Sequence, residues 1–146
     1  MSDLTKRECA IRAAAIIDTD GSIDINKLST NYAARCAVSN NDLRLLNWLK
    51  NVYGGSICES SNRRHKDGYK RRRSYKWTVT AQKAELFLRQ IAPFLIIKQK
   101  QAYCALGLRM EKGYHTRQIS PQEKQTMWRP YYDRMRKLNN KDTPHE

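Results

Sequence analysis

The sequence predicts an α+β fold, in which an antiparallel sheet carries helices on one face. Three observations support this prediction. Short strand patterns occur in pairs separated by turn residues, helical segments lie before, between and after these pairs, and hydrophobic residues make up 40% of the 146 residues, enough for one core. Strands joined as hairpins pair antiparallel, so the helices between the hairpins are expected to pack on one side of the sheet.

The first expected element is a helix near the N-terminus. Thr5 and Glu8 have the spacing of a capping box, in which each side chain accepts a hydrogen bond from an otherwise unpaired backbone N–H. The segment from Cys9 to Ile17 is rich in Ala and Ile and contains no Gly or Pro. We expect the helix to end at the polar residues 18–21, Asp-Thr-Asp-Gly.

A hairpin and a second helix are predicted next. Residues 22–26 alternate polar and apolar side chains, as in a half-buried strand, and residues 32–38 return as the partner strand after a short turn. Polar residues at 39–42 offer N-caps for a helix with leucines at helical spacing, which ends at Gly54–Gly55.

The rest of the chain is expected to add a second hairpin and three helices. The hairpin covers residues 56–80 and has a long basic middle. A helix over 81–91 follows it, ended by a proline, and another helix covers 98–111. Further on, Ser-Pro-Gln-Glu combines an N-cap, a first-turn Pro and an acid at the third position, which predicts a helix over 121–138.

The charge balance indicates a polyanionic partner. The chain has 28 Lys and Arg against 14 Asp and Glu, a net charge of +14. Self-repulsion of this size disfavours a compact domain unless an anion such as nucleic acid compensates it. The apolar runs are too short to cross a bilayer, and the N-terminus lacks the pattern of a secretory signal, so we expect no membrane partner. Four scattered cysteines without zinc spacing predict reduced thiols and an intracellular location, with organelle, phage-infected cell and prokaryotic cytoplasm left undistinguished.

Two carboxylates stand at the end of the first predicted helix. Asp18 and Asp20 face the partial negative charge of a helix C-terminus, which disfavours acids there by ~0.3–1 kcal/mol each. Such an arrangement favours a cation site, and Mg²⁺ needs few carboxylates because it keeps several waters. An EF-hand does not fit, because Gly21 as the required loop glycine would make Ile16 the first ligand. The competing interpretation is a polar turn with Gly21 at positive φ.

Residues 13–21, Ala-Ala-Ala-Ile-Ile-Asp-Thr-Asp-Gly, resemble the signature nonapeptide of the LAGLIDADG homing endonucleases. Five of the nine positions are identical and one is conservative; they are Ala14, Ile17, Asp18, Asp20 and Gly21, with Ile16 as the conservative one. The order of elements also resembles the αββαββα core of that family, whose antiparallel sheet forms a DNA-binding saddle. Residues 93–101 resemble the segment that opens the penultimate helix of its single-motif members.

The resemblance covers the chain from Thr5 to Met110. We therefore treat residues 1–112 as the endonuclease core and residues 113–146 as a C-terminal extension of the same single domain. The motif departs from the family pattern at Ala13, where Leu is usual, and at Ala15, where Gly is usual.

The resemblance implies a metal-binding acid, a polar residue that positions the attacking water, and two basic residues near the scissile phosphate. The implied catalytic residues are, in that order, Asp20, Asn40, Lys98 and Arg44. The implied metal is Mg²⁺, with Mn²⁺ as a substitute, bound by Asp20 and the backbone carbonyl of Thr19, while Asp18 is the more structural acid. Many relatives have Gln where this chain has Asn40. For Lys98 and Arg44 the alternative is an exposed helix residue without a catalytic role.

One motif per chain implies a homodimer. Each phosphodiester cut needs its own acid, and a double-strand break needs two cuts, so two chains would pair through their motif helices in an isologous contact. Small side chains allow such helices to approach closely. The predicted interface residues are Ala10, Ala13, Ala14 and Ile17. A symmetric pair of chains also predicts a pseudo-palindromic duplex target.

Polar side chains on one face of the strands are candidates for DNA contact. In residues 63–76 eight of 14 side chains are Lys or Arg, and bulky residues alternate with polar ones from Tyr69 onward, which favours a presented strand over a solvated loop or a localisation signal. A two-stranded ribbon fits the major groove, where Arg reads guanine, Asn reads adenine and acids accept from cytosine. The predicted DNA-binding residues are Ser22, Asp24, Asn26, Arg35, Cys58, Ser60, Asn62, Arg64, Lys70, Arg72, Ser74, Lys76 and Thr78. With about 6–10 phosphate contacts per dimer, affinity should fall roughly 10³–10⁵-fold between about 50 and 200 mM salt.

Together these observations predict a site-specific, Mg²⁺-dependent, homodimeric double-strand DNA endonuclease. By analogy with the family it leaves short 3′ overhangs and belongs to a mobile intron or intein. Two other hypotheses stay open: an RNA-binding intron maturase, and a non-catalytic DNA-binding regulator on the same scaffold. The intact Asp20 favours the enzyme, and RNA is expected as a partner only for the maturase.

Overall fold

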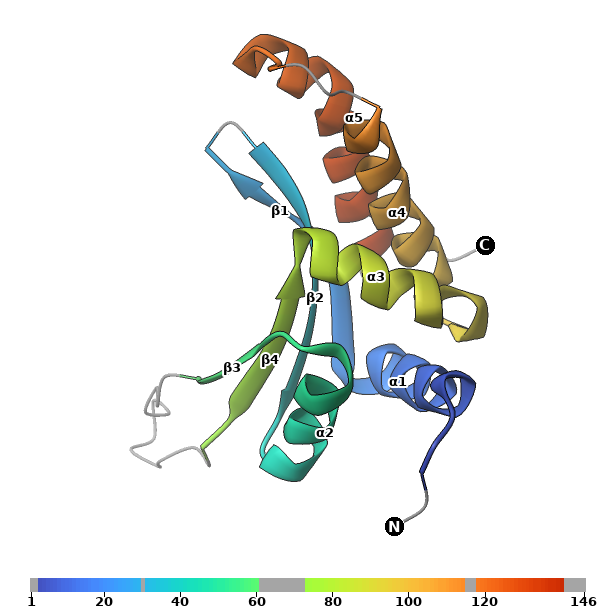
Figure 1. Cartoon of the computed structure of the whole chain (residues 1–146). Helices are drawn as coiled ribbons and strands as arrows, with labels where there is room; N and C mark the ends of the chain where they lie inside the picture. Colours follow the sequence, from blue (N-terminus) through green and yellow to red (C-terminus); the bar gives the residue numbers. More distant parts are fainter. Residues whose placement is uncertain (1–2, 30, 61–72, 115–117, 141–146) are drawn as a thin grey trace.

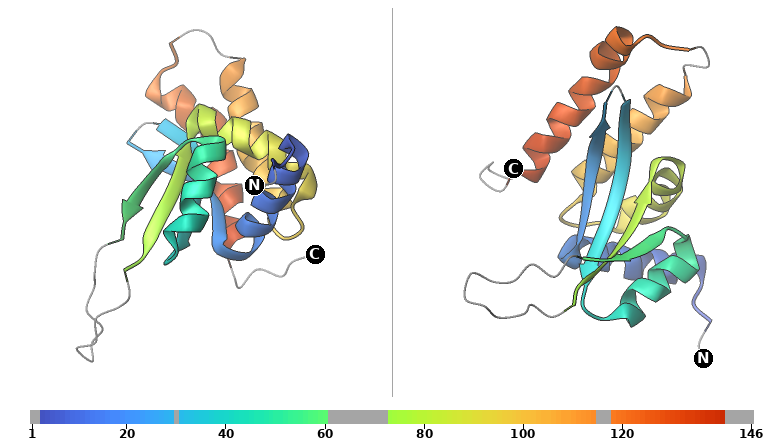
Figure 2. Two further views of the ribbon diagram at one scale, coloured as in Figure 1. Left: turned by 60° about the horizontal axis from the view of Figure 1, so that its bottom comes forward. Right: turned by 90° about the vertical axis from the view of Figure 1, so that its left-hand side faces the viewer.

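The computed structural model describes residues 3–29, 31–60, 73–114 and 118–140. In this part of the chain the strands form one antiparallel sheet of order β1-β2-β4-β3. The helices gather on one side of the sheet, and the other face is open, as the right-hand view of Figure 2 shows. The predicted α+β class and the helices on a single face are confirmed.

The order of elements follows the predicted αββαββα core and continues with two further helices (Figure 1). The elements are α1 (Lys6–Asp20), β1 (Gly21–Leu28), β2 (Asn31–Asn40), α2 (Leu43–Tyr53), β3 (Ser56–Glu59), β4 (Tyr75–Thr80), α3 (Ala81–Ile91), a 3₁₀ turn (Ala92–Phe94), α4 (Gln99–Gly113) and α5 (Pro121–Asn139). The helix predicted over 121–138 is thus present. No helix of the described residues has the length and apolar character needed to span a membrane.

The predicted capping box opens α1. The Glu8 N–H donates to Thr5 Oγ1 at 3.1 Å, and the Thr5 N–H donates to Glu8 Oε1 at 3.3 Å. The helix runs further than predicted, through Asp20, and β1 starts directly at Gly21. Gly21 has a φ of −100°, so the interpretation as a turn with positive φ is wrong. A Cβ at Gly21 would lie 2.7 Å from Cα of Ile17, so close packing of the strand against the helix end requires this glycine.

The sheet buries alternate side chains against the helices. Ile23 and Ile25 of β1 are buried, as are Trp77 and Val79 of β4, which confirms the predicted alternation in both strands. The Trp77 ring packs edge-on against Phe87 of α3, with centroids 5.2 Å apart. The core therefore lies between the sheet and α3, with α1 beside it (Figure 1).

The small-residue face of α1 belongs to this core. Its four residues are at most 3% exposed within the single chain; they are Ala10, Ala13, Ala14 and Ile17. Their assignment to a dimer interface is therefore wrong, because no surface of these side chains is left for a second chain. Their small size lets α1 approach the sheet and α3 of its own chain instead. The exposed side of α1 carries Ile11 and Ala15.

The C-terminal helix packs on the same core. Trp128 and Met135 of α5 are buried in it. The Tyr32 hydroxyl of β2 donates to Gln125 Oε1 at 2.6 Å, and Asn139 Nδ2 donates to the carbonyl of Ile23 at 3.0 Å. These contacts hold α5 beside the β1–β2 hairpin (Figure 1).

Candidate catalytic and nucleic-acid-binding site

Asp20 and Asn40 meet at one end of the sheet. Gly21 pairs with Val38 in the β1–β2 register, which brings the end of β2 next to the end of α1. Asn40 Nδ2 donates to Asp20 Oδ2 over a long 3.4 Å, and Asn40 Oδ1 accepts from the Asp42 N–H at 2.8 Å. The second bond fixes the orientation of the amide. The structure thus brings two of the predicted catalytic residues together, with Asp20 exposed.

Asp18 acts as a cap for the segment that leads into α4. Its carboxylate accepts from the backbone N–H groups of Ile96 at 2.7 Å, Ile97 at 3.1 Å and Lys98 at 3.0 Å. N–H groups at the start of a helix have no intrahelical partner, and a negative charge is favourable there. Both carboxylate oxygens are used in this way, which is the structural role that the family resemblance implies.

Lys98 binds the end of α1. Its Nζ donates to the carbonyls of Ile17 at 2.9 Å and Asp18 at 3.0 Å. These carbonyls lie in the last turn of α1, where a cation offsets the helix dipole and the charge of the neighbouring acids. The ammonium is therefore held against the backbone next to Asp20, and the interpretation of Lys98 as an ordinary surface lysine is wrong.

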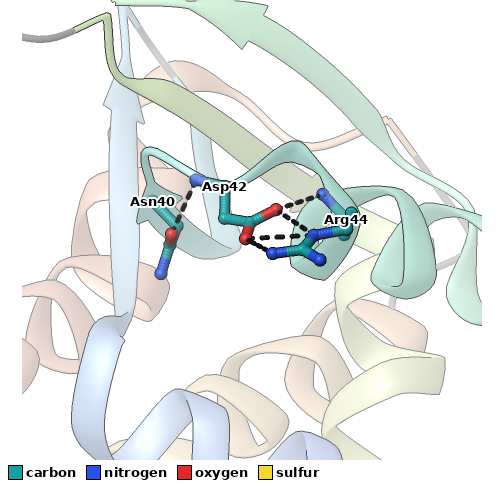
Figure 3. A network of polar contacts seen from close by, with 3 residues as sticks. All are labelled: Asn40, Asp42 and Arg44. Carbon is teal, nitrogen blue, oxygen red and sulfur yellow. Dashed lines mark hydrogen bonds and ion pairs between the residues drawn. The ribbon is translucent and has the colours of Figure 1, made fainter.

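Arg44 is held at the N-terminus of α2 by the residue that caps this helix (Figure 3). Asp42 accepts from the Arg44 N–H at 2.9 Å, and Arg44 Nη2 lies 2.6 Å from Asp42 Oδ2. The hydrogen bonds from Arg44 hold the pKa of Asp42 at about 2. The Arg44 side chain is 91% exposed, so its outer edge is open to a ligand although Asp42 limits its reach. Asn40, Asp42 and Arg44 form one series of contacts that leads from the site to α2.

A groove of about 590 Å³ lies beside these residues. It is lined by Arg12, Asn40, Asp42, Arg44, Leu45 and Trp48. The Arg12 guanidinium lies 5.2 Å from the centre of the Trp48 ring. Arg12 and Asp42 are not among the site residues predicted from the sequence. Arg12 could have been predicted as a site residue, because it lies on the helix that leads to Asp20.

The oxygen atoms of Asp20 and Thr19 suit a hard cation whose remaining ligands are not protein atoms. Among the described residues, no three His, Cys, Asp or Glu side chains come close enough to hold a metal ion together. The Thr19 hydroxyl is turned back along α1 and donates to the Ala15 carbonyl at 2.9 Å, and the backbone carbonyl of Thr19 is the candidate metal ligand that the family resemblance implies. One exposed carboxylate fits Mg²⁺, which keeps waters and binds phosphate oxygens, better than an ion that needs an all-protein cage.

The open face of the sheet gathers many of the predicted DNA-binding residues. The strand registers place on this face Ser22, Asp24, Asn26, Arg35, Cys58, Lys76 and Thr78. Ser60 and Ser74 continue it at the ends of the second hairpin, where the Ser60 N–H donates to the Ser74 carbonyl at 2.7 Å. The remaining predicted residues lie outside the described part of the chain; they are Asn62, Arg64, Lys70 and Arg72.

The fold is that of solved homing endonucleases. The homing endonuclease I-CvuI, in a DNA complex with Mg, matches with a TM-score of 0.71 and 16% identity, over 96% of this chain and 87% of that chain. The archaeal intron-encoded homing endonuclease I-Vdi141I, complexed with DNA, matches with a TM-score of 0.69 and 16% identity, over 94% of this chain and 88% of that chain.

A third structure carries the family name. The LAGLIDADG homing endonuclease I-GzeII, in complex with a DNA target, matches with a TM-score of 0.59 and 12% identity. The chain has the fold of the LAGLIDADG homing endonucleases. The match covers 95% of this chain and 45% of I-GzeII, so the chain spans about half the length of that LAGLIDADG protein. No protein-family model and no curated protein matches the sequence.

Proposed function

We propose that this chain is a site-specific DNA endonuclease that acts as a homodimer. The observation that carries the proposal is the exposed Asp20 carboxylate beside Asn40, at one end of an open sheet face with polar and basic side chains. I-CvuI and I-Vdi141I, which share the fold, are both described in complex with DNA. The net charge of +14 favours the same polyanion.

We infer the homodimer from the number of metal-binding acids in each chain. Each chain offers one Asp20, whereas a double-strand break needs one reactive site per strand. Longer proteins of this fold, such as I-GzeII, have about twice the length of this chain. A second copy supplies the second site, and Ile11 and Ala15 on the exposed side of α1 are the residues for an isologous contact.

Each residue of the site has a separate role in the proposed hydrolysis. Asp20 and the Thr19 carbonyl would hold Mg²⁺, which when bound would polarise the scissile phosphate. Asn40, oriented by its bond from the Asp42 N–H, holds a water near Asp20 by hydrogen bonding. Arg44 offsets the negative charge that grows on the phosphate. The products are one break in each strand with short 3′ overhangs.

Lys98 is a positioning residue for Asp20. Its ammonium binds the Ile17 and Asp18 carbonyls and keeps the end of α1, and therefore Asp20, in place. The positive charge also lowers the cost of bringing phosphate oxygens to a helix end that already carries two acids.

Selection from a library of randomised DNA duplexes tests the proposal. The purified chain is incubated with the library and Mg²⁺, with EDTA in a parallel reaction, and the cut ends are sequenced. We expect cut ends in the Mg²⁺ reaction that share one pseudo-palindromic sequence. Recovery of bound but uncut duplex would favour the regulator instead, and binding restricted to structured RNA would favour the maturase.

A further inference from the structure

We propose that Asp24 and Arg35 form a guanine-reading pair, in which Arg35 contacts the base and Asp24 is a positioning residue. The inference rests on the proposed DNA-binding function. It goes further because it names one feature of the target, a G·C pair in each half-site.

The pair is formed across the β1–β2 hairpin. Asp24 and Arg35 are direct partners in the strand register. Arg35 Nε donates to Asp24 Oδ1 at 2.9 Å, and Arg35 Nη2 donates to Asp24 Oδ2 at 2.7 Å. Both carboxylate oxygens and one edge of the guanidinium are used in this bidentate contact.

The other edge of the guanidinium suits guanine. An arginine has five N–H donors in a rigid plane, and the carboxylate engages only the edge formed by Nε and Nη2. The end-on fork, formed by one N–H of Nη1 and the second N–H of Nη2, lies outside this ion pair. Two parallel donors in that spacing match O6 and N7 of guanine in the major groove.

Arg35 and Asp24 are both partly exposed on the open face of the sheet. Arg35 lies on the open face of the sheet, and its neighbours on the same face of β2 are small, Ala33 and Ala37. The Arg35 side chain is 32% exposed and that of Asp24 is 31% exposed. The hydrogen bond to Asp24 raises the pKa of Arg35, so the guanidinium stays charged at every pH of interest.

Positioning by Asp24 has an energetic reason. A free arginine loses much rotamer freedom when it binds a base, whereas a guanidinium already fixed to a carboxylate loses less. The same contact changes the prediction for Asp24 itself. With both oxygens engaged by Arg35, we assign Asp24 the role of positioning Arg35 in place of the contact with cytosine that the sequence pattern suggests.

Duplex selection with three variants tests the inference. Wild type is expected to select guanine at one position of each half-site. Arg35→Lys keeps the charge but lacks the two parallel N–H donors. We therefore expect the preference for guanine at that position to fall roughly 5- to 150-fold, while the affinity for other duplexes stays similar. Asp24→Asn should weaken preference at the same position, and Asp24→Glu, which keeps the carboxylate, should restore part of it. Gln82→Ala, exposed on α3 on the helix side of the sheet, is the control and should leave that position unchanged.

The outcomes separate this inference from the proposed function. Identical base preferences for wild type and Arg35→Lys, in variants with wild-type circular dichroism spectra, would overturn the guanine-reading pair alone. A loss of affinity that is equal for all sequences would also overturn it, because Arg35 would then be a phosphate contact. If wild type binds no duplex at all, the proposed function fails and this inference fails with it.

Discussion

Lys98 donates two hydrogen bonds to Asp18, one from its backbone and one from its side chain. The Lys98 backbone N–H donates to Asp18 Oδ1 at 3.0 Å, and the Lys98 ammonium donates to the Asp18 backbone carbonyl at 3.0 Å. The first bond caps the segment that opens α4, and the second caps the end of α1. Because Asp20 is two residues beyond Asp18, these two bonds hold the proposed metal-binding carboxylate in place relative to α4.

The capping contacts of Asp18 predict a large loss of stability on substitution. Asp18→Ala removes three hydrogen bonds to a carboxylate, so we expect it to lower the free energy of unfolding by about 1–3 kcal/mol. Urea denaturation measures this change. Asp133→Ala is the control, because its ion pair with Arg129 is exposed and 3.7 Å long, and it should cost less than about 1 kcal/mol. An equal decrease in the free energy of unfolding for the two variants would show that the hydrogen bonds to Asp18 do not stabilise the fold by this amount.

The exposed side of α1 predicts which substitution breaks the proposed homodimer. Ile11 is 46% exposed on α1, and Ile11→Glu places a charge in the proposed contact. We expect the dimer to weaken at least about ten-fold, or about 1.4 kcal/mol, with an unchanged fold, as measured by sedimentation equilibrium. Met110→Glu is the control, since Met110 is 55% exposed in the last turn of α4, at the end away from α1 (Figure 1). Dissociation by the control variant, or a stable dimer of Ile11→Glu, would place the interface elsewhere.

Two cysteines on opposite faces of the sheet can report on the proposed DNA interface. Burial raises the pKa of the Cys36 thiol, so Cys36 is both protonated and shielded at pH 8. Cys58 is exposed on the open face. In the native protein at about pH 8 we expect a thiol reagent to modify Cys58 rapidly and Cys36 only on unfolding. The selected duplex should slow the reaction of Cys58, and a Cys58→Ser variant identifies its signal. An undiminished rate with bound duplex would mean that DNA does not cover this face.

Features that depend on neighbouring residues could be predicted from the sequence. The capping box of Thr5 and Glu8 needs only three residues of spacing, and the alternation that buries Trp77 and Val79 needs only a strand period of two. The order of helices and hairpins follows from such local patterns, and so does the α+β class.

Features that depend on distant contacts could not be predicted. The spacing of Ala10, Ala13 and Ala14 shows that one side of α1 is small, but not whether a sheet or a second helix covers it. The hydrogen bonds from Lys98 to Asp18 join residues 80 positions apart, which no local pattern encodes. The pairing of Asp24 with Arg35 depends on the hairpin register, and each residue alone looks like an independent DNA contact.

Strand-specific cleavage by a mixed dimer tests most directly whether each chain supplies one acid for one strand. Wild type and Asp20→Asn chains with different tags are combined, the mixed dimer is purified, and a supercoiled plasmid with the selected target is the substrate. We predict that the Asp20→Asn homodimer binds the target nearly as well as wild type without cutting it, and that the mixed dimer gives only nicked, open-circular plasmid. Linear plasmid from the Asp20→Asn homodimer at the wild-type rate would contradict the account.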